Sequence, residues 1–221
     1  MLEMLVLLSH KLTINTPAFA GGESMKISPI KEVEKGASSS SYNLSFQNHI
    51  GTHLDAPRHF DPNGKPLSFY SLDKFVYNNP LIIDVPKQCS ELIEPRDLES
   101  FRAKISQADL LLLRTGFQKY RNSDEEKYAT LNPGVSSRAA RYILDTFPDL
   151  KAMALDTISL SAVQNREEGR EAHRLLLRGR DFFILEDANL SNYPVNVKKV
   201  FIIPFFVVGI DSSPCTVFAE V

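Results

Sequence analysis

The sequence lacks several features that would point to particular classes of protein. It contains no tryptophan and only two cysteines, Cys89 and Cys215, which lie far apart and form no CxxC pair. A disulfide framework and a cysteine-rich zinc module are therefore excluded, and we expect two reduced thiols. Because the net charge is only −2 at pH 7, the chain has no strong field for nucleic acid or anionic lipid, and we expect neither as a partner.

Long hydrophobic runs are also missing. The apolar start, MLEMLVLLSHK, is short, carries Glu3, and has neither a basic leader nor a small-residue cleavage site. We expect a first strand there. The apolar stretch at residues 200–210 is too short to cross a bilayer and is interrupted by Pro204. These observations predict a soluble, cytoplasmic protein with no membrane partner.

The remaining composition is that of an ordinary globular chain. Of its 221 residues 43% are hydrophobic, and no repeat or low-complexity linker divides them, so we expect one domain over residues 1–221. Apolar spacing predicts helices at residues 95–104, 135–147 and 166–178. Short apolar runs predict strands at residues 81–85, 110–113, 152–155, 182–185, 200–208 and 216–221. This order indicates an α/β fold with a mixed sheet. The Gly- and Ser-containing residues 21–41 predict a loop or a mobile lid.

Histidine is scarce, yet three of the five histidines fall within eleven residues. This stretch contains His49, His53, Asp55 and His59. Gly51 and Pro57 argue against a helix, whereas in an extended segment the four odd-numbered side chains would share one face. Imidazole and carboxylate together suit zinc, manganese or iron(II), and three such ligands leave room for water and substrate. The pattern therefore predicts a metal site.

Other ionisable residues carry weaker signals. His173 lies in the second half of a predicted helix, and Glu186 and Asp187 directly follow a predicted strand. The charged residues 166–171 are most simply explained as a solvated helix face with i,i+4 pairing. His10 has no evident partner, and we expect that it binds no metal.

The run HIGTHLDAPRHF at residues 49–60 resembles the HxGTHxDxPxHF signature of the cyclase family of metal-dependent hydrolases. That family includes bacterial kynurenine formamidase and isatin hydrolase. Similar segments follow at residues 112–116 (LLRTG), 132–136 (NPGVS), 172–176 (AHRLL) and 184–186 (ILE). The resemblance implies a three-layer β/β/α swivelling-type domain, and a homodimer or a larger homo-oligomer.

The resemblance also implies roles for individual residues. The implied metal ligands are His49, His53, Asp55, His173 and Glu186. The first three would hold one ion, and Asp55 would bridge to a second ion on the last two; the metal would be zinc or manganese. His59 would be the general acid/base. Phe19, in a loop where kynurenine formamidases place a tryptophan, would contact an aromatic substrate.

The resemblance therefore implies hydrolysis of an N-formyl or cyclic amide of an aromatic small molecule, with an arylformamidase as the leading candidate and an isatin hydrolase-like enzyme as the alternative. Two further interpretations stay open. An iron(II) oxygenase could use His53, Asp55 and His173, but it would leave His49 and His59 unexplained. A non-catalytic metal-binding protein is the other, although structural zinc sites are usually closed and rich in cysteine.

Overall fold

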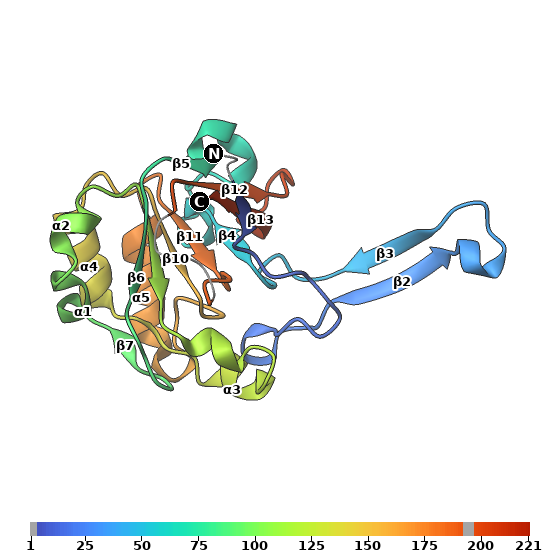
Figure 1. The fold of residues 1–221 in the computed structure, drawn as a ribbon, viewed down its shortest axis with the longest axis horizontal. Helices are drawn as coiled ribbons and strands as arrows, with labels where there is room; N and C mark the ends of the chain where they lie inside the picture. Colours follow the sequence, from blue (N-terminus) through green and yellow to red (C-terminus); the bar gives the residue numbers. More distant parts are fainter. Residues whose placement is uncertain (1–3, 192–196) are drawn as a thin grey trace.

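One large mixed sheet forms the centre of the molecule. The computed structural model describes residues 4–191 and 197–221, and within them the strand order is β5-β12-β13-β4-β11-β10-β8-β6, with β1 beside β13 (Figure 1). The strands are β1 (Leu5–Leu7), β4 (His53–Asp55), β5 (Val76–Tyr77), β6 (Pro80–Asp84), β8 (Leu110–Arg114), β10 (Ala152–Leu155), β11 (Phe183–Glu186), β12 (Lys199–Pro204) and β13 (Ser212–Glu220). The first strand expected at the start of the chain is thus confirmed as β1.

The sheet has a parallel half and an antiparallel half. Strands β6, β8, β10 and β11 run parallel to one another, whereas β4 pairs antiparallel with both β11 and β13. The parallel strands β8 and β10 read as continuous apolar runs, as expected for strands that are buried on both faces. Strand β4 therefore stands where the two halves meet, and this position places its side chains at the centre of the sheet.

Helices cover one face of the parallel half. They are α1 (Pro95–Glu99), α2 (Arg102–Ile105), α4 (Ser137–Thr146) and α5 (Arg166–Leu177), whereas α3 (Glu125–Thr130) packs against Phe117 in a separate small core. Leu111 of β8 lies in a core with Ile143 of α4 and Leu176 of α5, whereas Leu112 lies in a second core with Val217 of β13. Alternate residues of one strand thus contact helices on one side and further strands on the other. The predicted α/β fold with three β/β/α layers is confirmed.

The predicted helices agree with the structure to different degrees. Helix α5 begins and ends within one residue of the prediction, and α4 begins after Ser136, whose hydroxyl accepts a hydrogen bond from the Ala139 N–H. The helix predicted at residues 95–104 is divided into α1 and α2. Seven short 3₁₀ helices occur in the described residues: Phe19–Gly21, Val33–Lys35, Pro57–His59, Leu67–Phe69, Leu72–Phe75, Phe117–Tyr120 and Val163–Asn165. Strands β7 (Leu92–Ile93) and β9 (Gly134–Val135) form a separate parallel pair.

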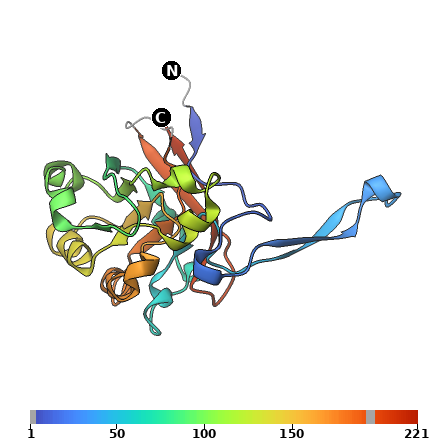
Figure 2. The same ribbon diagram turned by 90° about the horizontal axis from the view of Figure 1, so that it is seen from below.

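A long β-hairpin projects from the body of the molecule (Figures 1 and 2). It consists of β2 (Lys26–Lys31) and β3 (Ser41–Ser45), and we call it the arm. The prediction of a loop is therefore wrong for residues 26–31, whereas a role of residues 21–41 as a lid stays a prediction. Apolar and polar residues alternate along both strands, and Ile27 lies opposite Leu44 and Pro29 opposite Tyr42. The Ser and Gly residues of the segment are typical of loops and therefore favoured the wrong prediction.

Two further findings concern apolar segments. The strand predicted at residues 200–208 ends at Pro204, and residues 205–208 are exposed. None of the helices in the described part of the chain has the length and apolar character needed to span a bilayer.

Candidate metal centre and active site

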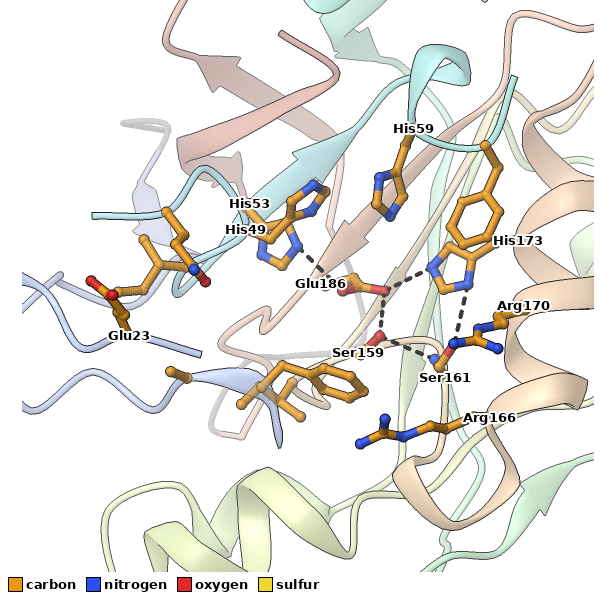
Figure 3. Close-up of a pocket in the computed structure, with 16 residues that line it drawn as sticks. Glu23, His49, His53, His59, Ser159, Ser161, Arg166, Arg170, His173 and Glu186 are labelled. Atoms are coloured by element: carbon orange, nitrogen blue, oxygen red, sulfur yellow. Dashed lines mark hydrogen bonds and ion pairs between the residues drawn. The ribbon is translucent and has the colours of Figure 1, made fainter. Parts of the chain in front are cut away.

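The fold brings together residues that are up to 137 positions apart in the sequence. His53 and Asp55 both lie on β4, and the antiparallel register of β4 with β11 places Glu186 directly opposite His53. His173 comes from the buried side of α5. Figure 3 shows His53, His173 and Glu186 converging on one cavity, with His49 and His59 beside them.

Asp55 is the centre of this cluster. Its Oδ1 lies 3.0 Å from His49 Nδ1 and 3.7 Å from His53 Nε2. Its Oδ2 lies 3.8 Å from His59 Nε2 and 3.9 Å from His173 Nε2. A single buried carboxylate therefore has four imidazole nitrogens within 4 Å, an arrangement that suits a carboxylate shared between two ions.

Glu186 is the second carboxylate of the cluster. Its Oε2 lies 3.2 Å from His53 Nε2, and its Oε1 lies 3.3 Å from His173 Nε2. Oε1 also accepts hydrogen bonds from Ser159 Oγ (3.0 Å) and from the Leu160 backbone N–H (2.6 Å). These two bonds hold one oxygen in place, so that the other faces His53.

The outer nitrogen of each of three histidines is held by a hydrogen bond. His53 Nδ1 lies 2.7 Å from the Gly51 carbonyl oxygen, and His173 Nδ1 lies 2.8 Å from that of Gly169. Because a carbonyl oxygen only accepts, both nitrogens carry the proton, and both Nε2 atoms are left facing the carboxylates. His49 is held by Asp211 through Nε2 at 2.9 Å, which leaves its Nδ1 towards Asp55. Metal-binding histidines commonly show this arrangement.

Buried atoms without hydrogen bonds test whether the cluster fits a metal. Both carboxylate oxygens of Asp55 and Nε2 of His53 are buried and make no hydrogen bond of acceptable geometry. Such atoms are costly unless a further group satisfies them. Two overlapping sets of donor atoms, each within 4.8 Å, surround them: His49, Asp55 and His59, and His53, Asp55 and Glu186. The donor set fits a divalent metal.

The electrostatics agree with this fit. Burial alone would raise the pKa of Asp55, but His59, His49 and His53 hold it well below its usual range. Burial would likewise raise the pKa of Glu186, which His173 and His53 lower to about 2. Burial alone would lower the pKa of His49, but Asp55 and Asp211 raise it to about 10. Both carboxylates are therefore charged, which is the form that binds a metal ion.

Asp211 was missed by the sequence reasoning. It lies just before β13, and its Oδ2 is 2.7 Å from His59 Nδ1 as well as 2.9 Å from His49 Nε2. Its Oδ1 accepts a hydrogen bond from Asn48 Nδ2 at 2.8 Å. As the acceptor at Nδ1, Asp211 fixes the His59 tautomer and leaves Nε2 free to exchange a proton on the side of Asp55. A lone Asp more than 150 residues from His59 gives no local signal.

The cavity beside the cluster has a volume of about 330 Å³. His49, His53, His59, His173 and Glu186 lie at its inner end, and Phe19 forms part of its apolar wall with Ile158 and Phe60. The structure therefore places Phe19 at the cavity, as the sequence resemblance implied. Its contact with a substrate stays a prediction, as do the division of ligands between two ions and the role of His59.

Two expectations about this region need correction. The extended path through residues 49–59 is wrong, because only residues 53–55 form a strand and His59 ends a 3₁₀ helix. Gly51 has φ +60°, a conformation that favours glycine, and a side chain there would overlap Leu12. Asp187 does not join Glu186 in the cluster but pairs with Arg121 at 2.7 Å.

The charged helix face also differs from its prediction. Two ion pairs on α5 have i,i+3 spacing, namely Glu167 with Arg170 and Glu171 with Arg174. Arg166 and Arg170 are exposed, as expected for a solvated face, yet both line the cavity. Spacing alone could not show which side of this exposed face borders a cavity.

Comparison with known proteins agrees with the geometry. Residues 6–162 match the family described as "Putative cyclase". The chain belongs to this family. The matched segment contains four residues of the cluster, whereas His173 and Glu186 lie beyond it and join the site through the fold.

Relatives of known name span most of the chain. A kynurenine formamidase from Bacillus cereus is 27% identical over 94% of this chain and 92% of its own length. Cyclase-like protein 1 from Arabidopsis thaliana is 26% identical over 94% of this chain and 81% of its own length.

Solved structures show the same fold. Isatin hydrolase A from Labrenzia aggregata aligns with a TM-score of 0.83 at 22% identity, covering 99% of this chain and 94% of that one. A predicted metal-dependent hydrolase from Bacillus stearothermophilus aligns with a TM-score of 0.77 at 20% identity, covering 99% and 98%. These alignments show that the chain shares the fold of both hydrolases.

Proposed function

We propose that this protein hydrolyses the N-formyl amide of an aromatic small molecule, as an arylformamidase does. The observation that carries the proposal is the Asp211–His59 pair beside Asp55. His59 Nε2 lies 3.8 Å from a buried carboxylate oxygen that has no hydrogen bond, and Nδ1 is held by Asp211 at 2.7 Å. An imidazole that is fixed beside a metal-type donor set suits proton transfer during the hydrolysis of an amide by a metal-activated water.

The reaction is an addition followed by cleavage. The oxygen of water adds to the amide carbonyl carbon, the C–N bond breaks, and the nitrogen leaves with a proton, giving formate and an arylamine. A bound zinc or manganese ion, or a pair of them on His49, His53, Asp55, His173 and Glu186, would supply an activated water and a polarised carbonyl. His59 takes a proton at Nε2 as the C–O bond forms and returns it to the departing nitrogen.

The cavity supports an aromatic substrate. Phe19, Phe60 and Ile158 border it, and about 330 Å³ suits a single ring with a side chain. A cyclic amide such as isatin is the second candidate, and the close structural likeness to isatin hydrolase A favours it. Ring opening needs the same proton transfer, because the nitrogen again leaves with a proton but stays attached to the product.

A turnover assay with metal analysis tests the proposal. The purified protein is loaded with zinc or manganese, its metal content is measured, and N-formylkynurenine and isatin are supplied. We expect turnover of one of them, and we expect His59→Ala to retain metal while losing most of that turnover.

Three outcomes would contradict the proposal. Near wild-type rates for His59→Ala would exclude His59 as the acid/base. Failure with a broad panel of formyl amides, cyclic amides and lactones at full metal occupancy would favour a non-catalytic metal protein. Oxygen consumption after addition of iron(II) and a candidate substrate would favour the oxygenase interpretation.

We also propose that the protein is a homodimer or a larger homo-oligomer, and that the arm binds a second copy. One face of the arm carries Ile27, Pro29, Tyr42 and Leu44, of which Ile27 is 43% and Leu44 58% exposed. A two-stranded hairpin with an uncovered apolar face is marginally stable alone. The same chain exposes a second apolar segment at residues 205–208, so two copies offer each other apolar surface.

Sedimentation velocity tests the assembly. We expect the wild type to sediment as a dimer or a larger species, and the double variant Ile27→Ser with Leu44→Ser to dissociate. Asn43→Ser, on the polar face of the arm, is the matched control and should leave assembly unchanged. A monomeric wild type would contradict the proposal, and so would a double variant that assembles as the wild type does.

A further inference from the structure

Two arginines of α5 lie on the same side of the helix as the candidate metal ligand His173. Arg166, Arg170 and His173 follow one another at i, i+4 and i+7, so they share a face, and all three line the cavity. With a rise of about 1.5 Å per residue, Arg170 lies about 4.5 Å and Arg166 about 10.5 Å along the axis from His173. Figure 3 shows both side chains on the side of Ser161, beyond His173.

Neither the dipole of α5 nor an ion pair explains why Arg166 and Arg170 lie at the cavity. Both arginines lie near the N-terminus of α5, where the helix dipole disfavours cations. Arg170 pairs with Glu167 at 2.6 Å, but these side chains are 52% and 80% exposed, and such surface pairs contribute little. Arg166 makes no ion pair in the described part of the chain. Its charge is therefore available to a ligand.

The other charged residue at the cavity wall does not neutralise the positive charges of Arg166 and Arg170. Glu23 is the acidic lining residue outside the donor cluster; it is 74% exposed and lies 3.8 Å from Lys26. Figure 3 places it across the mouth from Arg166 and Arg170. The mouth of the cavity on the α5 side is thus cationic, whereas the inner end carries the metal-type donors.

We propose that Arg166 and Arg170 bind a carboxylate of the substrate. This inference rests on the proposed amide hydrolysis and narrows its substrate to aromatic amides that carry an acidic side arm. A guanidinium group matches the two oxygens of a carboxylate through parallel N–H donors. With the carboxylate at Arg166 and Arg170, the ring lies against Phe19 and Ile158, and the amide reaches His59.

A matched pair of substrates tests this assignment. One is an ortho-formamidophenyl ketone with a propionate arm, and the other is its methyl ester, which has the same ring and amide but no charge. We expect the wild type to prefer the acid. Arg166→Gln and Arg170→Gln should each lower kcat/KM for the acid about 10- to 100-fold, mainly through KM, as expected for the loss of a charge-assisted hydrogen bond. Turnover of the ester should fall much less, because the ester offers the guanidinium groups no negative charge.

Arg174→Gln is the control variant, because Arg174 lies on the same helix and forms the equivalent exposed pair with Glu171 but does not line the cavity. It should behave as the wild type. Equal rates for acid and ester in the wild type would overturn the assignment, and so would equal losses for both substrates in the glutamine variants. Either result leaves the proposed amide hydrolysis intact.

Calorimetric binding of the two amine products gives a readout that needs no turnover. We expect the acid product to bind the metal-loaded wild type about tenfold tighter than its ester, and Arg166→Gln to abolish the difference. Equal binding of both products would overturn the assignment. If neither amide is hydrolysed but the acid product binds selectively, the proposed reaction fails while the arginine pair stands as an anion site.

Discussion

Replacing Asp211 by asparagine should slow the reaction by impairing His59. The carboxylate accepts the Nδ1 proton at 2.7 Å, and a charge-assisted bond of this length holds both the ring and its tautomer. General acid/base catalysis contributes ~10²–10⁴-fold, or about 2.7–5.5 kcal/mol of barrier. Because the Asp211 side chain is 28% exposed, water can replace part of the interaction, and we expect a loss of about 10²-fold in kcat.

The assay must separate this effect from metal loss. Asp211 also holds His49 at 2.9 Å, and loss of such an outer contact typically lowers metal affinity ~10–100-fold. Initial rates are therefore measured at saturating metal, with the metal content determined in parallel. Asp149→Asn, at an exposed position, is the control for removing one negative charge.

A double-mutant cycle decides whether Asp211 acts through His59. If it does, the variant carrying both Asp211→Asn and His59→Ala should be no slower than His59→Ala alone. Multiplicative losses in the double variant would refute the reasoning. An Asp211→Asn variant with full metal and wild-type kcat would refute it as well.

Four further predictions concern stability. Saturating zinc or manganese should raise the melting temperature, because an ion at 1,000 times its Kd adds about 4 kcal/mol; calorimetry with and without chelator checks this, and an unchanged transition would contradict metal binding. Gly169→Ala should cost ~1–3 kcal/mol in urea unfolding, since the added methyl group would overlap Ser161; a neutral result would show that this packing is loose. Arg121→Met should cost ~3–5 kcal/mol by leaving the buried Asp187 unpaired, and urea unfolding that matches the wild type would argue against it. Burial lowers the pKa of His10 to about 4. The stability that the neutral His10 contributes is therefore present above pH 6.5 and is lost as the pH falls towards 4, at about 1.4 kcal/mol per pKa unit. His10→Gln should flatten the pH dependence of the free energy of unfolding between pH 6.5 and pH 4.

The helices and strands that pack through one regular face could be predicted from the sequence. Helix α5 and strands β8 and β10 could be predicted from their apolar residues, because the apolar residues of these elements are the ones that the fold buries. The arm could not be predicted in this way. Its alternating apolar residues lie between Gly- and Ser-rich turns, and without a sheet on either side the pattern gave no clear strand signal.

The candidate site divides in the same way. The sequence by itself predicted that His49, His53, Asp55 and His59 share one site, because histidine is scarce and three of the five histidines lie within eleven residues. Only the tertiary structure decided that Asp211 holds His59 and that Arg166 and Arg170 border the cavity. Those placements depend on the pairing of β13 with β4 and on the rotation of α5 about its own axis. Both are set by packing between distant segments, which local spacing does not encode.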